Sequence, residues 1–277
     1  MKKHLNITLL ILTSIVVHIT TSCSHQPDNY LASDIRIYKN FEVWELAQCV
    51  EKDDTVCIKQ IINNHTEYLK FQEPKFGFTL LEWAVYNGRV KAIRQLVELG
   101  ANSNTQSHKG TSPFIRACAG YETSEYAKLM YEHGGDVNAV ANFDGGQPLR
   151  TPLIAASMAR LETVKFLVSK GAKVDYVYKN SEDALTAAIG ANNMDIAYWL
   201  ISSANAPIDR SYSKNIQGDA MDLPYRLRLK VYKLDSESYI YKMKIVEFIE
   251  SKGLDYKNEP IPKHLKEQLD SAYLEVY

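Results

Sequence analysis

The sequence predicts an all-α solenoid of about six helix–turn–helix repeats, with a degenerate repeat at each end. Three observations support this. Apolar helical stretches end at glycines that are followed by similar residues. A second recurring element, which begins with a helix-capping residue, stands upstream of these apolar stretches. Between these marks, apolar residues recur at helical spacing. The composition, 45% hydrophobic and 23% charged over 277 residues, is that of an ordinary soluble protein.

The recurring helix ends are marked by glycine. Gly100, Gly134, Gly171 and Gly253 each follow an apolar helical stretch, and Ala204 stands in the equivalent place between the last two. A glycine just past a helix is typical of a left-handed C-cap. We therefore expect five helix ends of one kind.

The recurring helix starts are marked by Thr79, Ser112, Thr151 and Asp183, which head the stretches TLLEWA, SPFIRA, TPLIAA and DALTAA. Thr, Ser and Asp are good N-cap residues, and proline is tolerated at the first helical position. The successive spacings are 33, 39 and 32 residues. A repeat of about 33 residues with one longer member is predicted.

This pattern resembles the ankyrin repeat, whose usual form is a turn, a first helix headed by T-P-L-H-x-A-A, a second helix and G-A-D-V-N. Residues 77–104 match that form nearly throughout. The histidine of the motif is replaced in every copy, by Glu82, Ile115, Ile154 and Thr186. The resemblance implies an all-α solenoid with β-turn or hairpin loops, in which the bracing by that histidine is partly replaced or lost.

The predicted organisation places an amino-terminal capping repeat at 41–75, central repeats at 76–217, and a divergent carboxy-terminal capping repeat with a terminal helix at 218–277. Terminal repeats are atypical because they face solvent on one side. Insertions at 142–147 and 210–238 break the period. They are either loops on the binding face or tolerated surface variation.

Residues 1–22 have the form of an export signal, with Lys2 and Lys3 ahead of an apolar run at 7–19. A run of 13 residues is short of the roughly 20 that span a bilayer as a helix. The sequence therefore favours a cleaved signal over a permanent transmembrane anchor.

The end of this signal resembles that of a bacterial lipoprotein, in which a peptidase cuts before a cysteine that then carries lipid. Cys23 is the residue to be lipidated, and residues 23–40 would form a tether. Thr20 departs from the pattern, since an aliphatic residue usually stands there. The alternative is a plain secretory signal. Under the lipoprotein interpretation the protein is anchored to a membrane of the bacterial cell envelope and faces the periplasm.

Cysteines and catalytic motifs give little sign of chemistry. Cys49 and Cys57 fall on the two predicted helices of the first repeat, where an oxidising compartment would permit a disulfide. The alternative is two small buried thiols. No metal-ligand spacing, nucleophile elbow, P-loop or dinucleotide fingerprint occurs, so we expect no metal, no cofactor and no enzymatic activity. A net charge of −1 argues against nucleic acid as a partner.

The family resemblance also implies where a partner would bind, since ankyrin-type proteins typically use their turn tips and the exposed side of their first helices. Carried over residue by residue, the implied partner-binding residues are Lys75, Phe76, Phe78, Trp83, Tyr86, Asn87, His108, Lys109, Thr111, Arg150 and Met158. The rings of Phe76, Phe78 and Tyr86 are expected to project near one another. The alternative is that one or two of them pack beneath the capping repeat.

The expected function is therefore non-enzymatic binding of a protein partner. Lipid-anchored ankyrin proteins of bacterial envelopes resemble immunity proteins that neutralise secreted antibacterial toxins such as lipase effectors. The main alternative is a scaffold or an accessory of an envelope enzyme or assembly. A third is an effector directed at eukaryotic hosts, against which the predicted anchor argues.

Overall fold

A computed structural model describes residues 30–120, 123–142, 151–178, 182–211, 214, 218, 221–267, 269 and 273–274. Within these ranges the regular elements are helices, and extended pairing is confined to isolated bridge residues, which are Lys214 and the antiparallel pair Tyr178 and Glu182. The all-α prediction is confirmed.

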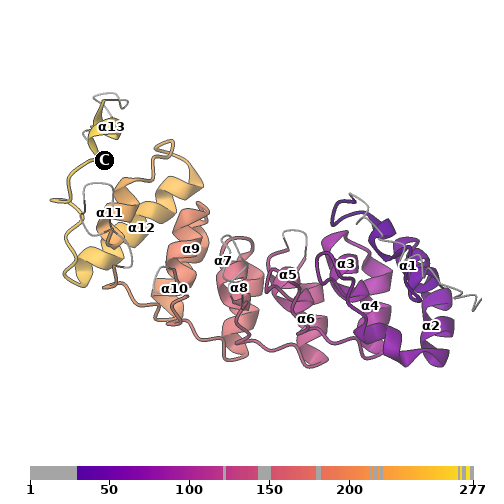
Figure 1. Ribbon diagram of the computed structural model, residues 1–277. Coiled ribbons are helices and arrows are strands. Elements are labelled where there is room, and N and C mark those ends of the chain that lie inside the picture. The colour runs from indigo at the N-terminus through magenta and orange to yellow at the C-terminus, as the bar shows by residue number, and fades with distance from the viewer. Residues whose placement is uncertain are drawn as a thin grey trace, which may run out of the picture.

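Six helix pairs follow one another along one axis, as Figure 1 shows. The first helices of the pairs are α1 (Trp44–Glu51), α3 (Leu80–Tyr86), α5 (Pro113–Cys118), α7 (Pro152–Ser157), α9 (Ala184–Gly190) and α11 (Leu223–Arg228). The second helices are α2 (Thr55–Asn64), α4 (Val90–Glu98), α6 (Glu125–Glu132), α8 (Leu161–Ser169), α10 (Met194–Ser203) and α12 (Glu237–Ser251). A short α13 (Lys263–Lys266) lies beyond the last pair (Figure 1).

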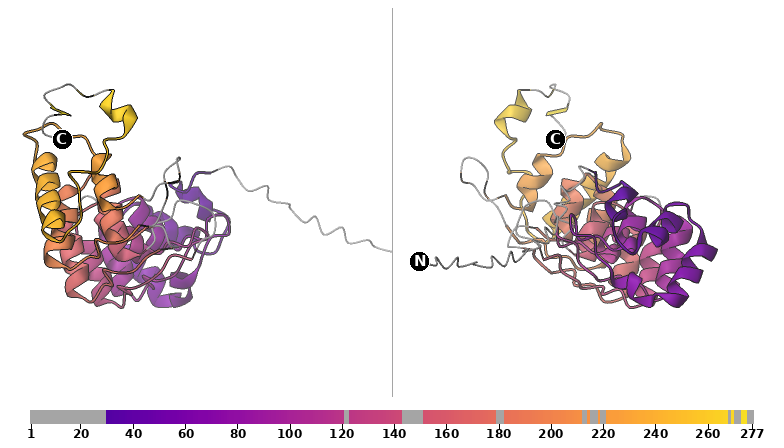
Figure 2. Two further views of the ribbon diagram at one scale, coloured as in Figure 1. Left: turned by 90° about the vertical axis from the view of Figure 1, so that its left-hand side faces the viewer. Right: turned by 45° about the vertical axis from the view of Figure 1, so that its right-hand side comes forward.

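Each first helix from α1 to α9 packs against its neighbours in its own row, and α2, α4 and α6 form part of a second row behind them. A view turned by 90° looks along the stack of repeats from its carboxy-terminal end, and a view turned by 45° shows the stack obliquely (Figure 2). The last pair departs from this regularity, because α12 packs chiefly on α10.

The predicted N-caps are confirmed. The side chains of Thr79, Ser112, Thr151 and Asp183 each accept a hydrogen bond from the backbone N–H three residues further on. Each satisfies a donor that the first turn of a helix leaves unpaired. The starts of these four first helices are therefore marked by residues that can be recognised from local sequence.

The predicted left-handed glycines are also confirmed at Gly100, Gly134, Gly171 and Gly253, with φ between 87° and 94°. The equivalent assigned to Ala204 is wrong. Helix α10 is ten residues long, one more than α4 or α8, so Ala204 is still its C-cap at φ −110°. Asn205 takes the left-handed position at φ 55°. Asparagine tolerates that conformation better than alanine does.

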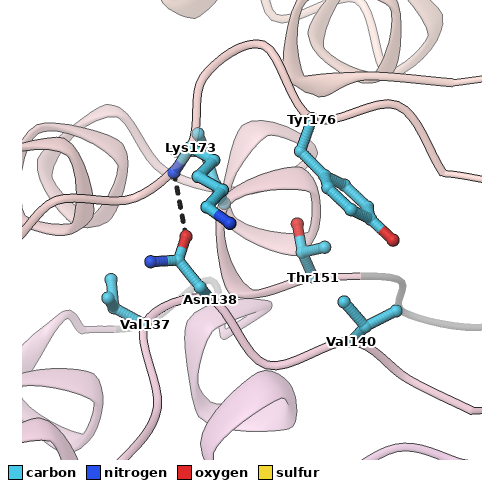
Figure 3. Close-up of a pocket in the computed structure, with 7 residues that line it drawn as sticks. Val137, Asn138, Val140, Thr151, Lys173 and Tyr176 are labelled. Atoms are coloured by element: carbon cyan, nitrogen blue, oxygen red, sulfur yellow. Dashed lines mark hydrogen bonds between the residues drawn. The ribbon is translucent and has the colours of Figure 1, made fainter.

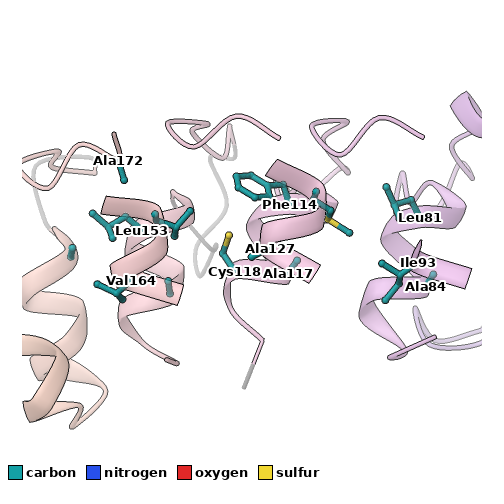
Figure 4. Close-up of a cluster of buried hydrophobic side chains, with 14 of the residues drawn as sticks. Leu81, Ala84, Ile93, Phe114, Ala117, Cys118, Ala127, Leu153, Val164 and Ala172 are labelled. Atoms are coloured by element: carbon teal, nitrogen blue, oxygen red, sulfur yellow. The ribbon is translucent and has the colours of Figure 1, made fainter. Parts of the chain in front are cut away.

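The hydrophobic core runs without interruption between the two rows of helices (Figure 4). Large side chains such as Leu81, Ile93 and Phe114 alternate in it with small ones such as Ala84 and Ala117, all of them buried. The small residues let neighbouring helices approach closely, and the large ones fill the remaining space. This continuity lets consecutive repeats stabilise one another.

Consecutive turns are joined by asparagine side chains. The Asn104 amide donates to the carbonyl of Gly134 at 2.8 Å, and its oxygen accepts from the N–H of Asp136 at 2.9 Å. Asn138 repeats both bonds one unit later. Bracing between the turns is thus present even though the motif histidine is missing.

The amino-terminal boundary differs from the expected one. Ile35–Tyr38 forms a 3₁₀ helix whose Ile35, Ile37 and Tyr38 side chains are buried. The Tyr38 hydroxyl donates to the carbonyls of Phe78 and Thr79, at 3.2 Å and 3.1 Å. This part of the predicted tether at 23–40 therefore belongs to the folded solenoid.

The carboxy-terminal cap is tied together by two buried cations. Arg228 donates to the carbonyls of Tyr256 and Lys257, at 2.9 Å and 3.3 Å, and lies 4.0 Å above the Tyr256 ring. Lys242 donates to the carbonyl of Lys230 at 2.9 Å. Burial, together with the smaller effect of the Arg228 charge, lowers the pKa of Lys242 to about 7. These bonds join α11, α12 and the segment after α12, including part of the predicted 210–238 insertion.

Cys49 on α1 and Cys57 on α2 are joined by a disulfide, with their Cα atoms 5.9 Å apart. We expect the Cys49→Ala/Cys57→Ala variant to lose about 2–3 kcal/mol of stability, because the bridge closes a loop of eight residues in the unfolded chain. Thermal unfolding followed by circular dichroism measures the loss. A reductant should lower the melting temperature of the wild type and leave the variant unchanged; equal sensitivity would contradict the prediction.

Candidate partner-binding site

Aromatic rings and cations from two neighbouring repeats meet at the turn tips and first helices. We call this surface the cation–aromatic platform and define it as Lys75, Phe76, Phe78, Tyr86, His108, Lys109 and Arg116. The turn before α3 supplies its first three residues, α3 ends at Tyr86, and α5 carries Arg116. His108 and Lys109 lie in the next turn. The platform thus spans the second and third repeats.

The rings form a continuous row. The ring centroids of Phe76 and Phe78 lie 5.8 Å apart, and those of Phe78 and Tyr86 also lie 5.8 Å apart. The Arg116 guanidinium lies 5.3 Å from the Phe78 centroid and 4.9 Å from that of Tyr86. At the other end, the Lys75 ammonium is 5.2 Å from the Phe76 centroid. These separations are those of aromatic and cation–π contacts.

Arg116 is held in place by Glu82, the residue that stands where the repeat motif has histidine. The Arg116 Nη2 donates to the Glu82 Oε1 at 2.9 Å, and the Glu82 side chain is fully buried. Burial raises the pKa of the Glu82 carboxyl to about 7, and the Arg116 guanidinium opposes part of that rise. This ion pair connects α3 to α5 and so joins two repeats.

The two turn tips are also in direct contact. The backbone N–H of His108 donates to the carbonyl of Phe76 at 2.8 Å. Within the first tip, the buried Glu73 carboxylate accepts from the N–H groups of Lys75, Phe76 and Phe78 at 2.7–3.0 Å. Such backbone bonds fix the conformation of the tip and satisfy the carboxylate. The platform is therefore preorganised at its turn end as well as at its helical end.

Gly77 allows this contact between the tips, since it has φ +72° and a Cβ there would lie 2.6 Å from the His108 ring and 2.8 Å from its backbone nitrogen. We expect Gly77→Ala to destabilise the protein more than Gly88→Ala does. Gly88 has φ +64° but open space around it, so its substitution costs about 1–2 kcal/mol from φ alone. Urea unfolding compares the two variants. Equal losses would mean that His108 moves aside freely.

Comparison with known families agrees with this architecture. Residues 46–141 match the family described as "Ankyrin repeats (3 copies)", and residues 153–201 match "Ankyrin repeats (many copies)". Together the two matches cover a little over half of the chain. The chain belongs to the ankyrin-repeat family. Ankyrin repeats are protein-interaction modules, so protein binding is the role that membership implies.

Several relatives share the ankyrin repeats of this protein. "Ankyrin repeat and KH domain-containing protein mask-1" of Caenorhabditis elegans is 26% identical over 61% of this chain and 7% of its own length. "Putative E3 ubiquitin-protein ligase XBAT35" of Arabidopsis thaliana is 37% identical over 34% of this chain and 20% of its own. "Neurogenic locus notch homolog protein 2" of Homo sapiens is 28% identical over 49% of this chain and 5% of its own length. The chain therefore spans less than a quarter of each relative.

The ankyrin positions predicted to bind a partner divide by exposure. Lys75, Tyr86, His108 and Lys109 are exposed. Phe76, Asn87 and Met158 are half-buried, the last packed beside Tyr178. Arg150 lies outside the described residues. The four exposed residues belong to the platform, whereas Met158 lies two repeats away from its first turn.

Three of the predicted positions lie inside the protein, so they are not exposed contacts of the ankyrin surface. Phe78, Trp83 and Thr111 are only 4%, 1% and 5% exposed. Phe78 is buried because Arg116 and the neighbouring rings cover it, and Trp83 points into the core between the helix rows. Thr111 lies in the tightly packed turn that enters α5. Of the three aromatic residues expected to project, Phe78 instead supports the other two.

Sequence reasoning missed Arg116 as a platform residue. The available signal was the charge of Glu82 at a position where the ankyrin motif has histidine, with an opposite charge 34 residues later. One repeat is about 33 residues, so opposite charges at that spacing fall on adjacent first helices. A search for such pairs would have found Arg116.

Two hollows of about 590 and 540 Å³ lie on the carboxy-terminal cap beside Tyr256 and Met243, whereas the turns of the central repeats leave less room for a small ligand. A cavity of about 80 Å³ is lined by turn residues including Asn138, Thr151, Lys173 and Tyr176 (Figure 3). It is far smaller than the roughly 300–1,000 Å³ of ligand sites. In the portion that the structure describes, no cluster of three or more metal-ligating side chains occurs, and no helix is long and apolar enough to cross a membrane.

Proposed function

We propose that this chain is a lipid-anchored ankyrin-repeat protein of the bacterial envelope that binds a protein partner through the cation–aromatic platform. The observation that carries the proposal is the platform itself. It presents Tyr86 at 47% exposure beside exposed cations, on a framework fixed by the Glu82–Arg116 pair. Aromatic and arginine side chains on a rigid surface are the usual anchors of protein interfaces.

Two features support an envelope location. The first 22 residues have the form of an export signal that leads into Cys23. The Cys49–Cys57 disulfide fits an oxidising compartment, such as the periplasm that such a signal leads to. A Cys23→Ser variant should lose incorporation of labelled fatty acid and should no longer partition into detergent. Retention of label by that variant would remove the lipoprotein part of the proposal.

The specific role that we propose is that of an immunity protein, which neutralises a secreted antibacterial toxin such as a lipase effector. Deleting its gene should make the native host sensitive to the product of a neighbouring gene. The wild-type chain should restore resistance and form a stoichiometric complex with that product. Capture of resident envelope proteins, without protection against any such effector, would instead identify a scaffold of an envelope assembly.

A matched pair of variants tests the surface. Tyr86 and Val90 are 47% and 48% exposed, the first on the platform and the second at the start of α4. Tyr86→Ser should weaken the complex by roughly 10-fold or more, as truncation of an aromatic anchor does. Val90→Ser should leave affinity unchanged. A larger loss of affinity for Val90→Ser than for Tyr86→Ser would place the interface away from the platform.

A further inference from the structure

We propose that the cation–aromatic platform binds an acidic segment of its protein partner. Carboxylate side chains of that segment would pair with Lys109 and Arg116, and an apolar or aromatic side chain would lie against Phe76 and Tyr86. This inference rests on the proposed function and adds the chemistry of the partner to it.

The outward-facing charge of the platform is positive. Lys75 and Lys109 are exposed at two turn tips that touch each other, and the Arg116 side chain is 20% exposed behind them. The whole chain has a formal net charge of −1, so this concentration of cations is a local feature. Complementary charge across an interface favours the correct partner and speeds association.

The carboxylates that belong to the same part of the surface are turned inward. Glu73 is 1% exposed and accepts three backbone N–H bonds, and Glu82 is buried against Arg116. Neither one presents a negative charge to an approaching partner. An acidic segment would therefore meet cations and rings among the described residues of the platform, with no like charge between them.

Arg116 is prepared to receive a carboxylate. Its guanidinium lies against two rings and donates one bond to Glu82, which restricts the side chain before any partner arrives. A planar guanidinium pairs with carboxylates through parallel N–H bonds, and a restrained side chain loses little entropy on binding. The exposed ring of Tyr86 beside it offers apolar area at the same point.

The depth of the platform favours a polypeptide over an anionic membrane. Tyr86 is the last residue of the seven-residue α3, so it lies about 9 Å along the helix from its start. A flat bilayer could touch Lys75 and Lys109 at the turn tips but would not reach down to Tyr86 and Arg116. A chain segment can contact all four.

Fluorescence anisotropy with labelled peptides tests the proposal. The probes are a peptide of repeating Glu-Tyr-Glu-Gly units and its Lys-Tyr-Lys-Gly counterpart. We expect the acidic peptide to bind at least 10-fold more tightly than the basic one, and to weaken as salt is raised. Lys109→Glu should reduce its affinity by roughly 10-fold. Lys91→Glu, an equal charge reversal at an exposed position of α4, should not reduce it.

Three results would overturn the proposal: equal binding of both peptides, equal effects of the two charge reversals, or Lys109-dependent binding to phosphatidylglycerol vesicles that the acidic peptide does not compete away. The outcomes also separate the proposal from the proposed function. If an immunity partner binds the wild type and Lys109→Glu equally well, the acidic-segment proposal fails and protein binding stands. If the acidic peptide binds as expected but no effector is neutralised, the immunity role fails instead.

Discussion

Replacing Arg116 with methionine should destabilise the protein by about 3–5 kcal/mol at pH 9 and by about 1–2 kcal/mol at pH 6. The difference arises from Glu82, which is fully buried and would lose its cation. Methionine keeps the aliphatic part of the side chain, so the comparison isolates the charge. Urea unfolding followed by circular dichroism at the two pH values measures both losses.

The direction of this pH dependence follows from the pKa of Glu82. Burial raises the pKa of this carboxyl from 4.5 to about 7, with Arg116 opposing part of the rise and Glu73 adding to it. The folded protein therefore holds the proton up to a higher pH than the unfolded chain does. The stabilisation that this proton gives the folded state is complete below pH 4.5 and is lost as pH rises through about 7. The loss amounts to about 3 kcal/mol of unfolding free energy. Removing Arg116 also removes the cation that lowers this pKa, so above that pH the variant must either bury an unpaired carboxylate or retain its proton.

Two further variants control this prediction. Glu82→Gln cannot ionise, so the Glu82→Gln/Arg116→Met double variant should lose the difference between pH 6 and pH 9. Lys128→Met breaks a surface pair with Glu162, whose side chains are 40% and 55% exposed, and should change stability little at either pH. If Arg116→Met lowers the free energy of unfolding by the same amount at pH 6 and pH 9, Glu82 is not the titrating group.

The features that sequence predicted well are those encoded locally. The caps at Thr79, Ser112, Thr151 and Asp183 each depend on a residue and the backbone three positions away. The left-handed glycines depend only on the helix that they end. The position predicted at Ala204 is wrong because one extra helical residue moves the left-handed conformation to Asn205. An alignment of the repeats by their recurring residues does not reveal a helix that is one residue longer.

The features that sequence missed depend on contacts between repeats. The ankyrin resemblance places Phe78 among the exposed partner-binding positions, yet Arg116 from the next repeat covers its ring. The Glu82–Arg116 pair joins residues 34 apart, beyond the reach of helical periodicity. The tether predicted at 23–40 includes Ile35–Tyr38, a 3₁₀ helix of four residues, which is too short to show a helical pattern in the sequence. Its role became apparent only from what Tyr38 contacts.

Tyr38→Ala is expected to destabilise the protein by about 3–5 kcal/mol, as removal of a buried aromatic ring does. The Tyr38 side chain is 0% exposed, and its ring centroid lies 6.3 Å from that of Phe71. A residue in a flexible tether would show no such cost. The variant therefore separates the two interpretations of residues 30–40, and thermal and urea unfolding measure it.

Tyr38→Phe divides the effect between the ring and the hydroxyl. The carbonyls of Phe78 and Thr79 also accept backbone N–H bonds, from Glu73 and Trp83, so neither is left unpaired when the hydroxyl is removed. We expect Tyr38→Phe to cost only about 0.5–1.5 kcal/mol. Leu31→Ala is the matched control, because that side chain is 74% exposed in the same segment and should change nothing. If Tyr38→Ala unfolds at the wild-type urea concentration, the segment is a tether after all, and the folded solenoid begins at α1.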